Sequence, residues 1–267
     1  MNNTIFEAQT TQTGPFKNAA ESLKDLLTEA NLECDEDGIK IMSMDASHSY
    51  LVCCTLYGCK FENYKCNQKI VIGVNIIYLF KIIRTLDSGE VLTLFMEEDN
   101  QDELGIKIDS EKKNSVTFSY LSLMDINEED YQLPATVFSS VITIPTSDFA
   151  KYCRDIFAIA NYMELKSIDN QIIISCKGDF ASYKKIITEN DTGLNFGKKS
   201  DPSEIIQGIF PIKYLVLFTK CNNLSQQLEL FFKNDYPLIM RYQIADLGEI
   251  RLALAPRETP SSEMSNV

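Results

Sequence analysis

The stretch GVNIIYLFKIIRTLDSGEVLTLFMEED, residues 73–99, combines one predicted helix with one predicted strand. Apolar residues recur at positions 76, 79, 80 and 83, a spacing that predicts a helix over Asn75–Leu86. The next three residues, Asp-Ser-Gly, have the composition of a turn. Apolar residues then alternate from position 92 to 96, which predicts a strand over Val91–Met96.

The same helix–turn–strand unit returns in the second half of the chain. It reads PIKYLVLFTKCNNLSQQLELFFKND, residues 211–235, and position 76 matches position 212, an offset of 136 residues without a gap. Unrelated units would rarely keep register over this length, so we expect an internal duplication and two similar domains. The identical residues are Ile76, Tyr78, Leu79, Leu92, Leu94, Phe95 and Asp99, which match Ile212, Tyr214, Leu215, Leu228, Leu230, Phe231 and Asp235.

The composition of the chain limits the classes of protein to which it can belong. With 267 residues and 45% hydrophobic side chains, it can bury a sizeable core. A net charge of −13 argues against a surface that grips nucleic acid everywhere, but it leaves room for one basic face. The 8 cysteines form no C-x-x-C pair and there is 1 histidine, so we expect no metal site and no cofactor. No apolar run has membrane-spanning length and no secretory signal opens the chain, which predicts the cytosol or the nucleus.

The remaining pattern predicts an α+β fold, with two helices and many antiparallel strands in each half. The second predicted helix of each half is the one described above; the first lies at Phe16–Ala30 and at Ser147–Ala160, with Ser147 as N-cap. Glu189–Pro202 is predicted as a polar loop. Predicted strands cover or lie within Ile5–Thr10, Gly38–Leu56, Phe61–Val74, Leu104–Ile108, Ser115–Leu123, Val141–Ile144, Tyr162–Ile168, Ile172–Lys177, Ser182–Thr188, Glu204–Phe210, Leu238–Ile244 and Ile250–Ala255.

The acidic segment MDINEEDYQLPATVFS divides the two halves of the chain. Its apolar residues follow neither the helical nor the strand periodicity. We therefore predict a first domain at residues 1–123, a connecting loop at 124–139 and a second domain at 140–257. Residues 258–267 are predicted to be a disordered polar tail.

Basic residues recur on one face of each predicted helix. Aligning the first helices of the halves at an offset of 130 residues places a basic pair on corresponding faces. Solvated helix faces often carry Lys and Arg, but four such faces in an acidic chain favour a strip that contacts phosphates without reading bases. No aromatic residues interleave with these charges, which favours a duplex over a single strand. The residues of this strip are Lys17, Lys24, Lys81, Arg84, Lys151, Arg154, Lys213 and Lys220.

Motifs spread from position 6 to position 256 resemble the proliferating cell nuclear antigen family of eukaryotic DNA sliding clamps. No single motif is specific, but together they follow the order of the family. They are FEA (6–8), LKDLLTEA (23–30), SMDASH (43–48), YKC (64–66), GVN (73–75), LMD (123–125), FAKYCRDI (149–156), YLVLFTK (214–220), YPLIMRYQIADLG (236–248) and LAP (254–256).

The resemblance implies a processivity factor for DNA polymerase, without catalytic residues, that encircles duplex DNA as a homotrimer. The helices would line the hole, with the basic strip toward DNA, and Ser115–Tyr120 would pair with Ser182–Thr188 of the next subunit. Further implied partners are a DNA polymerase, a clamp loader and other replication and repair proteins that carry a peptide motif, at the nucleus or at a viral replication site in the cytoplasm. The implied peptide groove comprises Met44, His48, Ser49, Leu51, Tyr131, Leu133, Phe138, Pro237, Ala253, Leu254, Ala255 and Pro256.

The chain departs from the family pattern at two functional positions. Ala253 stands where a tyrosine is usual, which predicts a roomier groove. The lysine that the family modifies aligns near Ile168 or Asp169, which puts ubiquitin-like attachment in doubt. The first alternative is a paralogous clamp that acts in a heteromeric ring or as a monomer. The second is an enzyme with a duplicated α+β fold, against which the sequence offers no catalytic motif.

Overall fold

A computed structural model describes residues 4–45, 47–127, 136–190, 193–199 and 204–257. The chain forms two compact units. Unit 1 comprises Met1–Pro134, Asn223–Ser225 and Tyr242–Arg251, and unit 2 comprises Ala135–Asn222, Gln226–Arg241 and Leu252–Val267. The predicted domain limits at 123/124 and 139/140 stay predictions. Half of the predicted connecting loop, residues 128–135, and the whole predicted tail, residues 258–267, lie outside the described residues.

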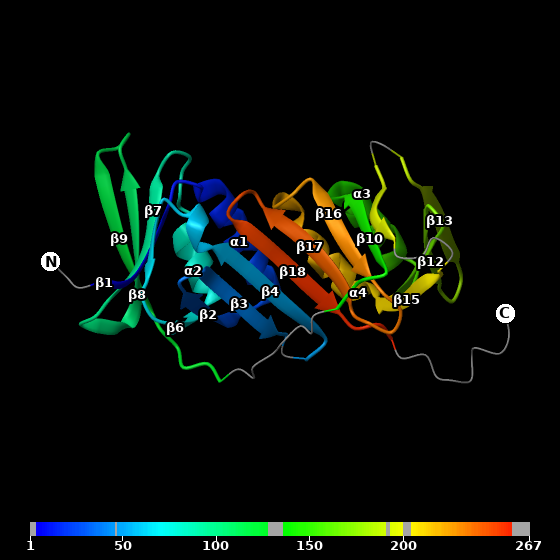
Figure 1. Cartoon of the computed structure of the whole chain (residues 1–267), viewed down its shortest axis with the longest axis horizontal. Coiled ribbons are helices and arrows are strands. Elements are labelled where there is room, and N and C mark those ends of the chain that lie inside the picture. Colours follow the sequence, from blue (N-terminus) through cyan, green and yellow to red (C-terminus); the bar gives the residue numbers. More distant parts are fainter. Residues whose placement is uncertain (1–3, 46, 128–135, 191–192, 200–203, 258–267) are drawn as a thin grey trace. The chain divides into compact units, whose positions relative to one another are not determined.

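Each unit contains two helices and antiparallel strands, which confirms the predicted α+β fold (Figure 1). The elements of unit 1 are β1 (Thr4–Thr10), α1 (Thr13–Leu26), β2 (Glu29–Asp35), β3 (Gly38–Met44), β4 (Tyr50–Tyr57), η1 (Gly58–Lys60), β5 (Asn63–Cys66), β6 (Ile70–Asn75), α2 (Ile76–Ile83), β7 (Val91–Glu97), β8 (Asn100–Ser110) and β9 (Ser115–Ser122).

The elements of the second half follow the same order. They are β10 (Ser140–Pro145), α3 (Thr146–Phe157), β11 (Tyr162–Ile168), β12 (Gln171–Lys177), β13 (Ser182–Thr188), β14 (Asn195–Lys199), β15 (Ile206–Pro211), α4 (Ile212–Phe218), η2 (Thr219–Asn223), β16 (Gln227–Phe232), β17 (Leu238–Ile244) and β18 (Gly248–Leu254). Strands β17 and β18 have residues in both units.

The order of strands repeats between the units. Unit 1 has the sheet β5-β1-β7-β8-β9 and the strands β6-β2-β3-β4, which continue into the part of β18 that belongs to this unit. Unit 2 has the order β14-β10-β16-β17-β18 and the sheet β13-β12-β11-β15. In this correspondence β13 is the counterpart of β4, and β9 is the counterpart of β18.

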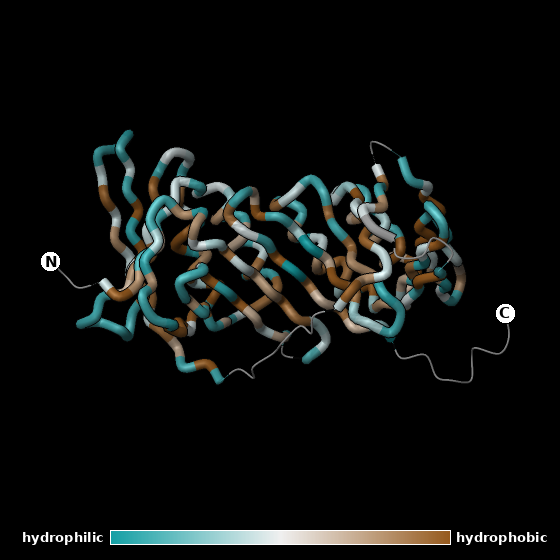
Figure 2. Tube along the Cα trace, viewed as in Figure 1, coloured by the Kyte–Doolittle hydropathy of each residue, from teal (hydrophilic) through white to brown (hydrophobic). Residues whose placement is uncertain are grey.

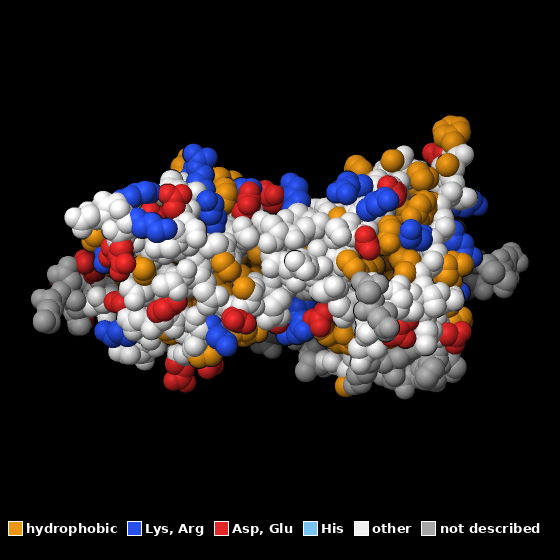
Figure 3. Space-filling view, turned by 90° about the horizontal axis from the view of Figure 1, so that it is seen from above, with side chains coloured by type: hydrophobic (Ala, Val, Ile, Leu, Met, Phe, Trp, Pro, Cys, Tyr) orange, Lys and Arg blue, Asp and Glu red, His pale blue; other side chains and the backbone are white. Residues whose placement is uncertain are grey.

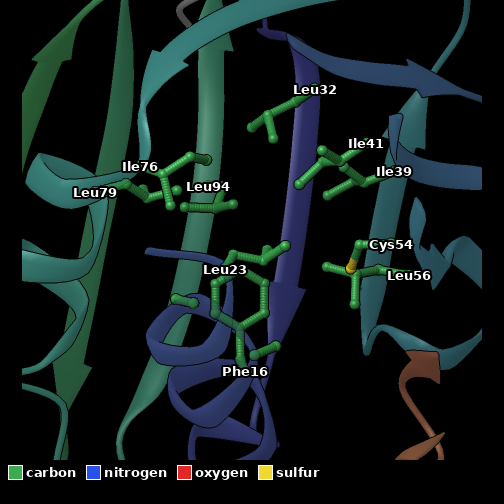
Figure 4. A pocket seen from close by; sticks show the side chains of 12 residues that line it. Phe16, Leu23, Leu32, Ile39, Ile41, Cys54, Leu56, Ile76, Leu79 and Leu94 are labelled. Carbon is green, nitrogen blue, oxygen red and sulfur yellow. The ribbon is translucent and has the colours of Figure 1, made fainter. Parts of the chain in front are cut away.

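The core of unit 1 is where its two helices meet strands of both sheets. Phe16 and Leu23 of α1 point toward Ile39 of β3 and Leu94 of β7 around a small apolar cavity of about 30 Å³ (Figure 4). A space of this size holds one water at most, so it is a packing gap in the core, not a ligand site. Figure 2 shows the same segregation along the chain, with hydrophobic positions concentrated in strands and helices and hydrophilic positions in turns.

The first helix is shorter than predicted. α1 ends at Leu26, and Leu27 is already extended with φ −132° and ψ 144°. The next residues form β2, which the sequence analysis missed, and its buried positions alternate as strand positions do. Ala30 was assigned to the helix because it is apolar, but it lies in β2 opposite Val74 of β6.

Three further predictions about the second half are corrected. Pro145, not Ser147, occupies the N-cap position of α3, and no side chain caps this helix. The polar loop predicted at Glu189–Pro202 contains β14, which pairs with β10. The first helices correspond at an offset of 133 residues instead of 130, because α1 begins TGPF at Thr13 and α3 begins TSDF at Thr146. The strand β2 agrees, since Ala30 opposite Val74 corresponds to Met163 opposite Phe210.

Candidate nucleic-acid interface

Helix α2 presents its basic residues to solvent. The side chain of Asn75 caps the helix by accepting the backbone N–H of Tyr78 at 3.1 Å. Lys81 and Arg84 are exposed, while Leu79 on the opposite side of the helix is buried. The ammonium group of Lys81 lies 4.0 Å from the centroid of the Tyr78 ring, a cation–π contact.

Helix α4 repeats this arrangement in unit 2. Lys213 is exposed and its ammonium group lies 4.4 Å from the centroid of the neighbouring Tyr214 ring. Lys220 is exposed in η2, which continues α4. Tyr78 and Tyr214 are one of the identical pairs of the duplication, so each unit holds a tyrosine next to a lysine. The prediction that no aromatic residue interleaves with the charges is therefore wrong, and the identical tyrosines of the two copies were the signal in the sequence for these contacts.

The two lysines of α1 are held by their own unit. Lys17 is half-buried and donates a hydrogen bond to the backbone oxygen of Leu86 at 3.2 Å. Lys24 is also half-buried, pairs with Asp25 at 2.7 Å and lies 4.9 Å from the centroid of the Phe80 ring. Both cations are therefore less free to reach a phosphate than those of α2.

In α3 both basic residues, Lys151 and Arg154, are exposed. At the structural offset of 133 residues, they correspond to Asn18 and Glu21 of α1, not to Lys17 and Lys24. The charge pattern of α2 is thus partly repeated in α4, whereas α1 and α3 carry their cations at different positions. Figure 3 shows blue Lys and Arg side chains interspersed with red Asp and Glu over the face that it displays.

Strand β9 is an edge strand with an unusually exposed apolar face. It ends the order β5-β1-β7-β8-β9, and Val116, Phe118 and Tyr120 are 48%, 54% and 53% exposed. The Tyr120 ring lies edge-on to Phe95 with 6.3 Å between centroids. An edge of this kind has unpaired backbone groups and apolar side chains, which together favour the addition of another strand.

Strand β13 is the matching edge of unit 2, at the end of the order β13-β12-β11-β15. Its side chains alternate between exposed and half-buried positions. Ile186 is 53% exposed, and Lys184 is exposed beside it. Lys185 points to the opposite side of the strand, with its ammonium group 4.6 Å from the centroid of the Tyr152 ring in α3.

The groove residues predicted in unit 1 surround the turn between β3 and β4. Met44 and Leu51 are opposite each other in the ladder, but Leu51 is only 8% exposed and belongs to the core. The carboxylate of Asp45 organises the turn by accepting backbone N–H groups of Ser49 at 2.6 Å and Tyr50 at 2.9 Å. His48 is exposed at the tip with a φ of 52°.

In unit 2 the predicted groove residues are partly buried. The Phe138 ring packs against Phe231 and Tyr236, with centroid distances of 5.4 Å and 5.6 Å. Ala253 and Leu254 are 6% and 1% exposed, so their side chains belong to the core rather than to an exposed groove wall. Pro237 and Pro256 are half-buried and Ala255 is exposed, whereas Tyr131 and Leu133 lie outside the described residues.

The metal-binding potential and the thiols of the described residues were predicted from the sequence to carry no chemistry. Among them no group of three or more His, Cys, Asp or Glu side chains is placed to hold a metal ion. Burial raises the pKa of the Cys53 thiol to about 11, although the charge of Arg251 opposes this shift. Burial likewise raises the pKa of Cys34 and Cys153, so these thiols stay protonated at neutral pH. In the same described part of the chain, no helix has the length and apolarity needed to cross a membrane.

Comparison with known proteins agrees with this architecture. Residues 5–131 match the model of the N-terminal domain of proliferating cell nuclear antigen, and residues 132–257 match the model of its C-terminal domain. The structure is similar to the crystal structure of the proliferating cellular nuclear antigen from Entamoeba histolytica, with a TM-score of 0.86 and 24% sequence identity. The alignment covers 96% of this chain and 100% of that one. Because the two family models together span the chain, it belongs to the proliferating cell nuclear antigen family of non-enzymatic DNA sliding clamps.

Proposed function

We propose that three copies of this chain form a closed ring that slides on duplex DNA and tethers replication and repair proteins, including a DNA polymerase and the loader that opens the ring. A closed ring stays on DNA because it encircles the duplex. Weak contacts that are screened by salt therefore suffice, and they let the ring slide. Family membership supports the clamp function, and nuclear or viral replication sites are the places where such a ring would act.

The proposal rests on two corresponding pairs of strands, β4 with β18 and β13 with β9. Within unit 1, β4 has the first residues of β18 as its neighbour. Their counterparts β13 and β9 are both edge strands. If the duplicated strands interact as the originals do, β13 of one copy pairs with β9 of the next. Each copy then uses two different edges, and head-to-tail contacts of this kind close into a ring when the rotation fits.

The exposed cations of α2, α3 and α4 would contact the phosphates of the enclosed duplex. Lys81, Arg84, Lys151 and Arg154 reach solvent, as do Lys213 and Lys220. In this proposal Lys17 and Lys24 contribute less, because each is engaged within unit 1. None of these contacts reads bases, so binding would not depend on sequence.

Partner proteins would dock a short peptide near the connecting loop, as the resemblance implies. The exposed or half-buried residues Met44, His48 and Ser49 in unit 1, and Phe138, Pro237, Ala255 and Pro256 in unit 2, are the described candidates for these contacts. Ala253 is small, which is consistent with a roomier pocket, although its side chain is buried here.

Oligomer mass and retention on DNA together test this proposal. Size-exclusion chromatography with light scattering should give the mass of a trimer, about three times the 30.3 kDa of the chain. The ring, loaded by a clamp loader, should remain on closed circular DNA and leave after the DNA is cut. A monomer mass at all concentrations would argue against the homomeric ring and favour a heteromeric or monomeric clamp. Equal retention on circular and linear DNA would argue against a topological link.

A further inference from the structure

Phe180 is the most exposed large hydrophobic side chain among the described residues. It lies between β12 and β13 in the turn Gly178–Ala181 and is 103% exposed. A phenylalanine ring without any contact gives no stability to its own unit, whereas its burial against a partner would strengthen association by about 10- to 100-fold. The exposed side chain of Phe180 therefore favours binding to another molecule and does not stabilise its own unit.

The turn that carries Phe180 is held in place. The backbone N–H of Gly178 donates to the oxygen of Ala181 at 2.9 Å and closes the turn. A Cβ at position 178 would lie 2.1 Å from the backbone oxygen of Ile159, so the turn packs directly on the segment after α3 and requires glycine. A side chain presented by an anchored turn loses less conformational freedom on binding than one on a loose loop.

The internal duplication predicts where this turn would lie in the proposed ring. In unit 1 the backbone N–H of Tyr57 donates to Leu247, a Cβ at position 248 would lie 2.0 Å from the oxygen of Thr55, and the charge of Arg251 acts on Cys53. Residue numbers therefore run in opposite directions along β4 and β18, so these strands are antiparallel. By this correspondence, the start of β13 meets the end of β9 in the next copy.

An open hollow lies at the end of β9. It has a volume of about 740 Å³ and is formed by the first residues of β8 and by residues 122–125. Met124 is 39% exposed there, and Leu123 is half-buried beside it. The carboxylates of Asp102, Glu103 and Asp125 line the same hollow.

The hollow is anchored as firmly as the turn. The backbone N–H groups of Leu123 and Met124 donate hydrogen bonds to the backbone oxygens of Asp102 and Gly73, respectively, both at 2.9 Å. A Cβ at position 73 would lie 2.1 Å from the oxygen of Met124, so this approach also requires glycine. The strand next to Phe180 carries the exposed Lys184, whose charge is opposite to that of the acidic residues that line the hollow.

We propose that Phe180 of one copy inserts into the hollow at the end of β9 in the next copy and contacts Met124 and Leu123. This inference rests on the proposed ring and adds to it an aromatic anchor outside the paired strands. The anchor has one orientation, because its plug is in unit 2 and its hollow is in unit 1. It therefore favours head-to-tail closure over symmetric pairing of two like edges.

The test compares the full-length protein with Phe180→Ser, Met124→Ser and the double variant by light scattering over a dilution series. Each single change should weaken the contact between subunits by about tenfold. The trimer of the double variant should dissociate no more than that of the more strongly affected single variant, because both changes remove the same contact. Val71→Ser, at a position that is 56% exposed on β6, is the matched control and should leave the trimer unchanged.

The outcomes separate this inference from the proposed function. A wild type that stays monomeric contradicts the ring, and the anchor with it. A wild-type trimer whose dissociation is the same in Phe180→Ser overturns the anchor alone. Weakening by Phe180→Ser that simply adds to the effect of Met124→Ser also overturns it, because the two side chains would then not touch. Circular dichroism of the monomer should be unchanged in Phe180→Ser, since the ring makes no contact within its unit.

Discussion

Strands β4 and β13 occupy the same place in their units but face different surroundings. β4 reads YLVCCTLY and is almost entirely buried, with a neighbour on each side. β13 reads SYKKIIT and alternates between exposed and half-buried side chains at an open edge. Cys54 of β4 corresponds to Lys185 of β13, because Cys54 lies opposite Ile41 and Lys185 lies opposite Ile174. The covered copy of the strand thus carries no charged side chain, whereas the open copy carries Lys184 and Lys185.

Strands β18 and β9 differ in the same way. β18 reads GEIRLAL and is buried at all but one position, whereas β9 reads SVTFSYLS and is exposed at all but two. Aromatic side chains on the open strand are expected if another copy covers it, and they are an aggregation hazard if none does. The differences between the copies therefore indicate which edges assemble, while their shared residues indicate which positions the fold itself requires.

The largest effect on stability should follow when the lysine of the open strand β13 is placed at the corresponding position of the covered strand β4. Cys54→Lys puts an ammonium group where the side chain is 1% exposed. Burying a charge at this position should lower the free energy of unfolding by about 3–5 kcal/mol. Urea denaturation measures this loss.

The reverse change is the control for that prediction. Lys185→Cys removes a charge from the half-buried side of β13, where only a cation–π contact with Tyr152 is lost. It should change the free energy of unfolding by less than about 1 kcal/mol. Equal losses in the two variants would contradict the view that burial, not position in the repeat, decides the residue type.

A charge on the open face of β13 should break assembly without unfolding the chain. Ile186→Lys adds a third cation next to Lys184 and Lys185 and removes apolar area that the next copy would cover. We expect monomers at concentrations at which the wild type is a trimer, measured by analytical ultracentrifugation. Val71→Lys is equally exposed but lies on β6, and it should remain trimeric. A trimeric Ile186→Lys would remove β13 from the interface.

The sequence predicted the fold where periodicity and burial agree. The helix and strand of residues 76–97 and their copy keep the same offset in the structure because both bury one regular face. It failed at the end of α1, where Leu27 and Ala30 are apolar at helical spacing, but Leu27 is already extended and Ala30 pairs with Val74 of β6. Pairing between strands that are distant in the sequence decides where such a helix ends, and the local spacing of apolar residues gives no information about this pairing.

The candidate interface was predicted less completely than the fold. Sequence spacing placed six of the eight basic side chains in exposed positions, but it could not show that Lys17 and Lys24 are engaged by Leu86 and Asp25. The family resemblance implied a groove that includes Leu51, Ala253 and Leu254, whose side chains are buried in the structure. An apolar residue at a strand end has the same sequence signature whether its side chain faces a partner or the core.

Exposed and engaged cations should differ in their effect on DNA retention. Lys81→Glu with Lys220→Glu reverses two exposed charges and should shorten retention of the loaded ring on circular DNA. It should also lower the slope of log affinity against log salt by about 2 or more. Lys24→Gln should change this slope by less than about 0.5, because Lys24 is already paired with Asp25. Both proteins should stay trimeric, and equal slopes would show that engagement within unit 1 does not matter.

The smallest effect concerns the turns that precede β4 and β13. Burial raises the pKa of Asp45, but hydrogen bonds from Ser47, Tyr50 and Ser49 outweigh it and hold the pKa below its usual 3.8. The stabilisation from Asp45 is therefore complete above pH 3.8 and is lost as pH falls through the lower pKa of the folded state. Asp45→Asn should lower the melting temperature at pH 7 and have a smaller effect at pH 3. Asp179→Asn, in the turn closed by Gly178 and Ala181, is the control variant for the same measurement. An equal loss for Asp45→Asn at both pH values would mean that the shape of the side chain, and not its charge, holds the turn before β4.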